Sequence, residues 1–472
     1  MTTIFYLSIY LVGLSFALHF SKNIPTWILV TTSFLWGKLI WILCSLFLLF
    51  LRIEYTAKNM ILVFSLFFVV TTILLVYRKI TSFSVQHILL MLLGLIVTGL
   101  LGYAFTQQSY VFATADSFGL ILLGRVLGRS GLQEWSLNRF TARGFLSPVF
   151  LMASNLLPGD FISGYQTILA LCMLIAMSVS VYLELRNHFK VVIALALTIA
   201  MSSTFLTIIF IEHAVYIHTN LTAAILLFTA LTFFWNFLKK GSNDWLILGV
   251  IALLGFSFTR IEGPLFAIFM LALFIQSDRL SYRQSIGVAL SFSLPVAAWY
   301  TYLLLTTSQQ RLLTPTNTLI IIASAVGLIL FAAGRKWFNR LAGLPQYIFG
   351  VLILGLVATF LLKPNHMFSS SLHIIQNLIH WSSWGISWIV IAFFFPAIIQ
   401  LGKMKEEDRW LGLCIYGYVV LVVMMAFVRI PYRIGRTDSA NRLLLQIQPL
   451  ILFFIATQGR RIAEWFTFPE GD

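Results

Sequence analysis

The sequence predicts an all-α protein that crosses a membrane many times. Hydrophobic residues make up 60% of its 472 residues, only 10% are charged, and the mean hydropathy is +0.93. A soluble chain of this length carries far more charge. Apolar runs of roughly 20 residues recur along the chain, and a helix of that length crosses the hydrocarbon with its main-chain amides satisfied.

These runs indicate about fifteen segments, so we expect about 13 to 15 transmembrane helices. They are 4–20, 25–51, 60–77, 85–105, 161–185, 191–211, 216–238, 245–258, 263–275, 286–305, 318–334, 346–362, 384–401, 410–428 and 443–457. The eighth and ninth are short. Residues 146–157 are apolar but too few to span, and we interpret them as re-entrant or interfacial.

The distribution of basic residues predicts the orientation. Lysine and arginine accumulate in short cytoplasmic connections, and this rule is best satisfied with the carboxyl terminus inside. Two segments on the opposite side are nevertheless basic, and both carry arginine without lysine. They are residues 107–145, with Arg125, Arg129, Arg139 and Arg143, and residues 429–442, with Arg429, Arg433, Arg436 and Arg442.

These outer arginines predict an anionic ligand, because a guanidinium fork binds phosphate in a bidentate manner. The alternative is that they pair with lipid headgroups. The net charge of +15 is spread over many short loops, so we expect membrane lipids as partners and no nucleic acid.

The long external loop 106–145 contains a second helical pattern. Residues 117–129 alternate bulky apolar residues with Arg125 and Arg129, which are four residues apart and share one face, as in a helix that lies in the membrane interface. Asp116 precedes this helix, where the unpaired amides favour a carboxylate. It is interpreted as a helix cap, a catalytic base, or both.

Several short motifs carry a family resemblance. Within 115–150 these are Asp116, Arg125, Gly131 with Leu132, Asn138 with Arg139, and Gly144, Phe145, Ser147 and Pro148. This segment resembles the first external loop of the GT-C superfamily of membrane glycosyltransferases, and most closely that of the mycobacterial terminal arabinofuranosyltransferase-like family. Ala115 stands where that family has the first of two carboxylates.

The resemblance continues more sparsely over 85–461. Its further residues are Glu212 in IEHAVYIHTNLTAAILL, Arg260 and Glu262 in FTRIEGPL, and Arg436, Arg442 and Pro449 in GRTDSANRLLLQIQPLILFF. Residues 85–461 would then form a GT-C-like catalytic module whose first external loop extends to 160. Residues 1–84 are predicted to add three transmembrane helices, and residues 462–472 to form a short cytoplasmic tail.

The resemblance implies an enzyme of the cytoplasmic (inner) membrane with its site facing the periplasm or exterior. It would transfer a hexose, or a pentofuranose such as arabinose, from a polyprenyl-phosphate donor to a glycan, lipid or protein acceptor. The roles expected are catalytic for Asp116 and Glu212; donor phosphate binding for Arg433, Arg436, Arg442 and Arg260; and acceptor binding or site shaping for Arg143, Arg139, Glu262 and His213. No metal ligands are predicted, although a divalent cation stays open as a cofactor.

Two other classes use similar ligands. An O-antigen ligase or polysaccharide polymerase also takes lipid-linked sugars, but its long basic external loop usually comes late in the chain. A lipid-linked saccharide flippase should show internal repeats and polar residues spread through its spans, and neither is found. His366, His373 and His380 recur every seven residues, a spacing that favours one face of an interfacial helix over a metal site.

Overall fold

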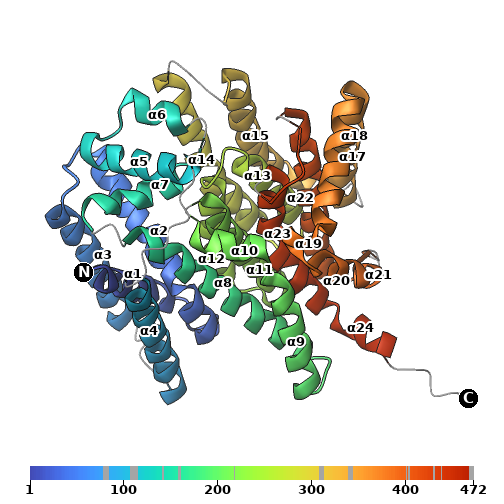
Figure 1. Ribbon diagram of the computed structural model, residues 1–472, viewed down its shortest axis with the longest axis horizontal. Helices are drawn as coiled ribbons and strands as arrows, with labels where there is room; N and C mark the ends of the chain where they lie inside the picture. Colours follow the sequence, from blue (N-terminus) through green and yellow to red (C-terminus); the bar gives the residue numbers. More distant parts are fainter. Residues whose placement is uncertain are drawn as a thin grey trace, which may run out of the picture.

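The computed structural model describes residues 1–77, 84–106, 115–140, 143–157, 161–216, 218–307, 313–338, 344–399, 401, 404–428, 431–436 and 438–466. Within these ranges the chain is almost entirely helical, as predicted (Figure 1). The amino-terminal half contains α1 (Thr2–Leu18), α2 (Thr26–Phe50), α3 (Ala57–Tyr77), α4 (Val85–Thr106), α5 (Ala115–Ser130), α6 (Glu134–Phe140), α7 (Leu146–Leu151), η1 (Met152–Asn155), α8 (Phe161–Arg186), α9 (Val191–Phe205), α10 (Ile208–Val215) and α11 (Thr219–Lys240).

The remaining described helices follow without a strand between them. They are α12 (Asn243–Ser257), α13 (Gly263–Ile275), α14 (Tyr282–Thr306), α15 (Pro315–Ala333), α16 (Arg335–Phe338), α17 (Leu344–Leu362), α18 (Pro364–Ile379), α19 (Trp381–Trp384), α20 (Ser387–Phe393), α21 (Phe395–Ile399), α22 (Glu406–Val428), α23 (Ser439–Thr457) and α24 (Gly459–Phe466).

The helices confirm a polytopic membrane protein. Among the described residues, 10 helices are long and apolar enough to cross a membrane, and the pair α9–α10, bent by 67°, makes up to 11. The helices α1, α12 and α13 are apolar but shorter. The larger number expected from the sequence is reached only when these three are counted as spans.

One expected span is wrong in detail. Residues 384–401 do not form a continuous helix, because the chain breaks into α19, α20 and α21. Gly385 lies at the first break with a φ of 55°, a left-handed conformation that a side chain disfavours. Hydropathy detects the apolar composition of this stretch but does not reveal such a break in the helix.

The helices form a central layer and an outer shell. Over the most apolar stretch of each helix, 94% of α11 and 89% of α23 is buried, against 17% of α3, 11% of α4 and none of α17. The exposed helices carry large apolar side chains such as Leu62, Leu93 and Leu354. An apolar outer surface of this kind is stable only against lipid.

The first two helices are packed backbone to backbone. A Cβ on Gly37 would lie 1.8 Å from the carbonyl oxygen of Ile9, and one on Gly13 would lie 1.9 Å from that of Ser33. Small residues allow such approach between helices in lipid. The pair then packs against α4, and α2 also contacts α7 and α8, so the predicted additional helices are joined to the rest of the molecule by tertiary contacts.

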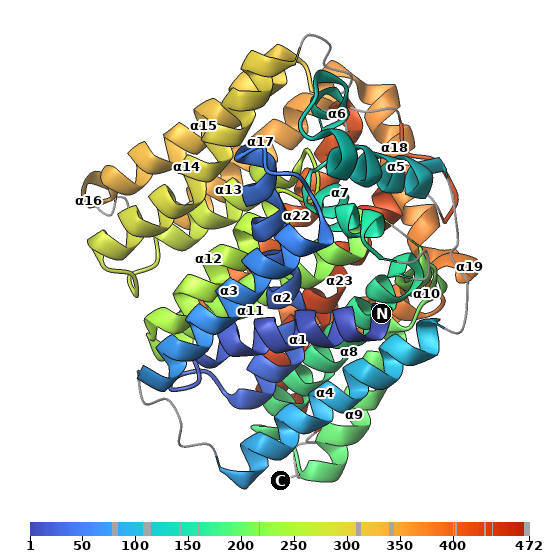
Figure 2. The same cartoon turned by 90° about the vertical axis from the view of Figure 1, so that its left-hand side faces the viewer.

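A helix is confirmed where the interfacial helix was predicted, and it is α5; the short apolar segment after it forms α7 and η1. The two pack closely because a Cβ on Gly124 would lie 2.8 Å from the Pro148 carbonyl oxygen and one on Gly128 would lie 2.2 Å from Asn155 Nδ2. Figure 2 shows α5, α6, α10 and α19 along the right-hand side of the view, with α16 on the left. These four described helices, which lie in or beside segments predicted to be external, therefore gather on one side of the helix bundle.

Candidate active site

Asp116 lies in the first turn of α5 and faces Arg143 from the segment after α6. Arg143 Nη2 donates to Asp116 Oδ1 and Nη1 donates to the Asp116 carbonyl oxygen, both at 2.8 Å. Gly119, one turn on, leaves room for this contact, since a Cβ there would lie 3.3 Å from Arg143 Nη2. The fork of Arg143 therefore binds the main chain and the side chain of one residue together.

The second guanidinium at Asp116 comes from the carboxyl-terminal part of the chain. Arg442, near the start of α23, places Nη1 3.5 Å from Asp116 Oδ2, and its Nη2 donates to Ser439 Oγ at 3.1 Å. The Asp116 side chain is 43% exposed, while the Arg442 side chain is 18% exposed. The carboxylate thus stands at the open edge of a partly buried pair of cations.

His218 holds Arg442 from the other side. Its Nε2 lies 3.3 Å from Arg442 Nη1, and its Nδ1 lies 3.4 Å from Thr219 Oγ1. Burial lowers the pKa of His218 well below its usual range, and the Arg442 guanidinium lowers it further. The imidazole is therefore neutral at neutral pH, so that Nε2 accepts from Arg442. The 3.8 Å separation of Nε2 from Asp116 Oδ2 is too long for a hydrogen bond.

A second acid–arginine pair lies on neighbouring elements. Glu212 of α10 and Arg436 form an ion pair with 3.0 Å between Oε1 and Nη1, and their side chains are 28% and 46% exposed. The helix α10 begins at Thr207, whose hydroxyl accepts from Phe210 N at 3.2 Å as a cap. The structure thus brings Glu212 into contact with one of the predicted phosphate-binding arginines.

The segment that carries Arg436 is held on α18 by polar contacts. Asn377 Nδ2 donates to the Arg433 carbonyl oxygen at 2.8 Å and Asn377 Oδ1 accepts from Gly435 N at 2.9 Å. Asp438 caps α23 by accepting from Ala440 N at 2.8 Å, and also accepts from Arg433 N at 3.0 Å. Gly435 has a φ of 140°, a conformation that favours glycine. These contacts fix the main chain at Arg433, Gly435 and Asp438.

Arg260 lies beneath the exposed pairs in a buried polar network. Its Nε donates to Glu262 Oε1 at 2.5 Å, with side chains 10% and 3% exposed, and its Nη1 donates to Asn220 Oδ1. Asn220 Nδ2 lies 3.1 Å from His213 Nε2 and Oδ1 accepts from Gln446 Nε2 at 3.4 Å. Charges at this depth are stable only when they are paired and hydrogen-bonded. The Arg260 guanidinium is therefore buried and bound to Glu262 and Asn220.

The Gly144–Phe145 motif joins the loop to the turn that carries Arg260. A Cβ on Gly144 would lie 2.2 Å from the carbonyl carbon of Thr259, so only glycine fits. Leu146 N donates to the Phe258 carbonyl oxygen at 3.2 Å, and Phe145 packs its ring 4.7 Å from that of Phe258. This docking places Arg143 above the buried network.

Two predicted site residues lie apart from the paired groups. The Arg139 guanidinium lies 5.2 Å from the ring centroid of Trp135, a cation–π contact within α6. Arg433 is exposed, and its contacts to Asn377 and Asp438 are made by its main chain. Arg429 and residues 467–472 of the predicted tail lie outside the described residues. His366 and His373 lie on α18, and their rings hydrogen-bond the carbonyl oxygens of Ala426 and Tyr432.

Four polar residues were not predicted from the sequence: the buried Lys38, Asn220 and Gln446, and His218, whose side chain is 11% exposed. Lys38 of α2 is completely buried; its Nζ donates to Thr222 Oγ1 at 2.9 Å and lies 4.9 Å from the ring centroid of Phe150. A lysine inside an apolar run is a sufficient signal for such a residue. The sequence signal for His218 is weaker: it is a polar residue two positions after Tyr216, at the start of a polar turn.

The residues around Asp116 do not fit a divalent cation. The residue before Asp116 is Ala115, which has no ligand oxygen in its side chain, and the guanidinium groups of Arg143 and Arg442 both contact the carboxylate. Within the described ranges, no three histidine, cysteine, aspartate or glutamate side chains gather as metal ligands. The chemistry of this cluster is therefore that of a carboxylate and its guanidinium partners.

No protein-family model, curated protein or solved structure matches this chain. The assignment of function therefore rests on the residues and their geometry.

Proposed function

We propose that this protein is a membrane glycosyltransferase that takes its sugar from a polyprenyl-phosphate donor. The observation that carries the proposal is the contact of the Asp116 carboxylate with two guanidinium groups, those of Arg143 and Arg442, at one end of the helix bundle. Sugar transfer from a lipid phosphate needs both kinds of group: a base for the acceptor hydroxyl and cations for the phosphate that leaves.

Asp116 is the base in this proposal. Its carboxylate accepts the proton of the acceptor hydroxyl while that oxygen forms a bond to the anomeric carbon. The bond between the anomeric carbon and the donor phosphate oxygen breaks, and its electron pair stays on the phosphate. The partial exposure of Asp116 supports this role, because a base must be reached by the acceptor. No acid is needed for the leaving group, since the lipid phosphate leaves as an anion.

Arg442 and Arg436 are assigned to the donor phosphate. Both lie on the segment from 431 to the start of α23, and each already contacts a carboxylate, so an incoming phosphate would share cations that are held in place. Arg143 keeps Asp116 oriented through its two hydrogen bonds. Glu212, which binds Arg436, is assigned to orienting the acceptor. His213, the next residue, is assigned to shaping the site.

Arg260 and Glu262 act as positioning residues in this scheme. Their buried pair holds Asn220, next to the His218–Thr219 turn that contacts Arg442. The same proposal places the reaction at the outer face of the membrane. It also gives the chain the larger number of transmembrane helices that is typical of GT-C enzymes. The predicted orientation by basic residues supports them.

The test is a transfer assay with the purified full chain and purified polyprenyl-phosphate sugars. We expect Asp116→Asn to lower the turnover by about 10²- to 10⁴-fold, the usual contribution of a positioned base. Glu134→Gln in α6 is the matched control, because it removes a carboxylate from the same loop. Lipid-donor binding should persist in Asp116→Asn. Wild-type turnover in this variant would remove Asp116 from the role of base.

A second measurement separates the enzyme from a flippase. In sealed proteoliposomes, a flippase moves the lipid-linked saccharide across the bilayer without forming a new glycosidic bond. Detection of the new bond with the wild-type chain supports the proposal. Movement of the intact donor without any transferred product, over all donors tested, would contradict it.

A further inference from the structure

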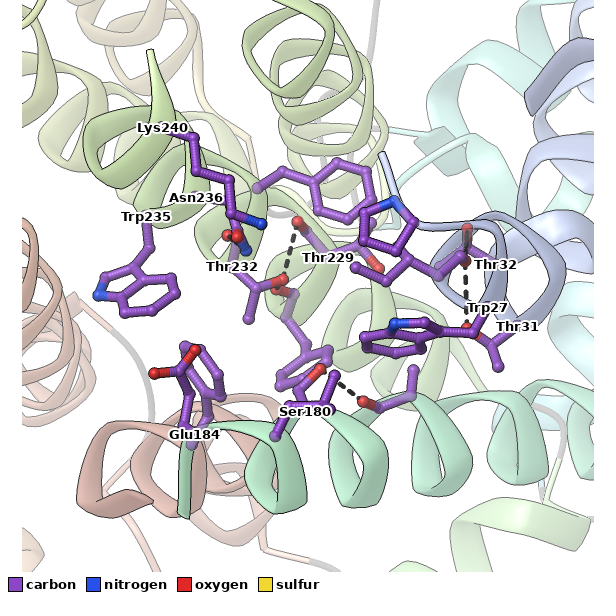
Figure 3. A pocket seen from close by; sticks show the side chains of 17 residues that line it. Trp27, Thr31, Thr32, Ser180, Glu184, Thr229, Thr232, Trp235, Asn236 and Lys240 are labelled. Atoms are coloured by element: carbon purple, nitrogen blue, oxygen red, sulfur yellow. Dashed lines mark hydrogen bonds between the residues drawn. The ribbon is translucent and has the colours of Figure 1, made fainter. Parts of the chain in front are cut away.

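A hollow lies at the opposite end of the bundle from Asp116. Its walls are formed by α2, α8 and α11, with Phe453 of α23, and its empty volume including the open mouth is about 630 Å³. Figure 3 shows Asn236 and Lys240 of α11 on one side, Ser180 and Glu184 of α8 on another, and Trp27, Thr31 and Thr32 of α2 closing the third.

The hollow lies at the level of the membrane face opposite to the one that carries the candidate site. The 22 residues of α11 run from Thr219, beside His218 in the candidate site, to Lys240 at the mouth of the hollow. At 1.5 Å per residue the helix is about 33 Å long. This length matches the roughly 30 Å hydrocarbon core of a bilayer. The hollow therefore opens where headgroups of the opposite leaflet lie.

Of the charged side chains that line the hollow, Lys240 is the cation that a ligand can bind. Glu184 is already paired, since Lys239 Nζ lies 3.1 Å from both of its carboxylate oxygens. Lys240 rests 4.9 Å from the ring centroid of Trp245 and, among the described residues, forms no ion pair. A basic face with such a lysine attracts an anionic headgroup.

The hydroxyl groups in the wall favour a ligand that donates hydrogen bonds. Thr32 and Thr232 each donate at 2.7 Å to a carbonyl oxygen of their own helix, that of Ile28 and that of Phe228, and Ser180 donates likewise to Ala176 at 2.7 Å. Because their protons are used, Ser180 Oγ and Thr232 Oγ1 offer only lone pairs to the hollow. Thr32 Oγ1 is already an acceptor, since Trp36 Nε1 donates to it at 2.9 Å. A headgroup that carries hydroxyl groups complements such a wall.

The remaining lining is apolar and leads to the lipid. Ile28, Ala176, Phe228 and Phe453 line the hollow, and Leu183 at its edge is 40% exposed on the outside of α8. An acyl chain can therefore pass from the hollow to the bilayer. A small soluble anion would leave this apolar surface uncovered.

We propose that this hollow binds an anionic phospholipid whose headgroup carries hydroxyl groups, with its phosphate at Lys240. The hydroxyl groups of the headgroup donate to the oxygens of Ser180 and Thr232, and an acyl chain lies against Leu183. The site is separate from the Asp116 cluster and does not depend on the transfer reaction.

Lipid binding to the purified full chain in detergent tests the proposal, by native mass spectrometry and by thermal stabilisation during lipid titration. Dioleoyl phosphatidylglycerol should bind more tightly than dioleoyl phosphatidic acid, which lacks the alcohol groups of the headgroup glycerol, and than dioleoyl phosphatidylcholine, which is zwitterionic. Inorganic phosphate should neither stabilise the protein nor displace the lipid. Equal binding of the three lipids, or displacement by phosphate alone, would overturn the proposal.

Two variants locate the site. Lys240→Gln should weaken phosphatidylglycerol binding about fivefold, the equivalent of about 1 kcal/mol per cation near an anionic lipid. Lys190→Gln is the matched control, because Lys190 is an exposed lysine outside the lining. Thr232→Val keeps the shape and removes the oxygen, so it should reduce the preference for phosphatidylglycerol over phosphatidic acid. Unchanged binding in both Lys240→Gln and Thr232→Val would refute this location.

Discussion

Arg143 binds Asp116 twice, once through the carboxylate and once through the main-chain carbonyl oxygen, each at 2.8 Å. The two bonds use both terminal nitrogens of one guanidinium, so they fix the Asp116 side chain relative to the first turn of α5. The geometry of the candidate base is therefore determined by a residue 27 positions further along the chain.

A lysine at position 143 should keep the charge and lose this double contact. The ammonium of Arg143→Lys is a point charge that cannot bridge the carbonyl and the carboxylate in the same way. Because both side chains are partly exposed, we expect a kcat about tenfold lower rather than a loss of folding. Arg283→Lys, at an exposed position in the first turn of α14, should leave kcat unchanged. Equal kinetics for the two variants would argue against a positioning role for Arg143.

The lowered pKa of His218 predicts that the folded protein becomes less stable in acid. Burial lowers the pKa of His218 in the folded chain, whereas an unfolded histidine titrates near a pKa of about 6.5. The unfolded chain therefore binds more protons at this residue as the pH falls below about 6.5, and the folded state loses stability over that range. The protonated ring would also repel Arg442.

The measurement is the thermal unfolding midpoint between about pH 8 and pH 5. The unfolding temperature of the wild-type protein should decrease as the pH is lowered below about 6.5. His218→Asn cannot be protonated and should show a smaller fall over the same range. Parallel curves for the two proteins would show that another group is responsible.

Gly144 should tolerate no side chain. In Gly144→Ala the new Cβ would lie 2.2 Å from the main chain of Thr259, so either the loop or the turn must move. Overpacking of this kind costs about 1–3 kcal/mol, and here it also displaces Arg143. We expect a lower unfolding midpoint together with reduced transfer. Gly287→Ala is the control: Gly287 lies in α14, and among the described residues nothing would lie within 4 Å of its new methyl group, so alanine there should be neutral or stabilising.

The Arg260–Glu262 pair should behave as a buried ion pair. Arg260→Met leaves Glu262 as a charge in a site where its side chain is 3% exposed, which is expected to destabilise the protein by about 3–5 kcal/mol. Arg260→Met with Glu262→Leu removes both charges and should recover much of that loss. Chemical unfolding in detergent measures both. A double variant no more stable than the single variant would show that the polar network, rather than the charge balance, is essential.

Composition and periodicity determined much of this protein directly. The apolar runs predict the spans because lipid demands about 20 residues of satisfied helix, and α5 was predicted to within two residues at its start from its helical pattern. Asp116 was singled out as a carboxylate before an apolar helix, Arg436 and Arg442 as members of an external arginine cluster, and Glu212 through a family resemblance. Such signals are local, so a single sequence contains them.

Only the tertiary structure decided which of these charges meet. Asp116 and Arg442 are separated by 326 positions, and the contact depends on α5 lying over α7 while α23 passes through the centre of the bundle. The same packing buries Arg260, makes His218 a neighbour of Arg442 and breaks the segment after Trp384. Contacts between distant segments depend on how whole helices pack, and the free energy of that packing is shared among many weak apolar contacts that no short motif records.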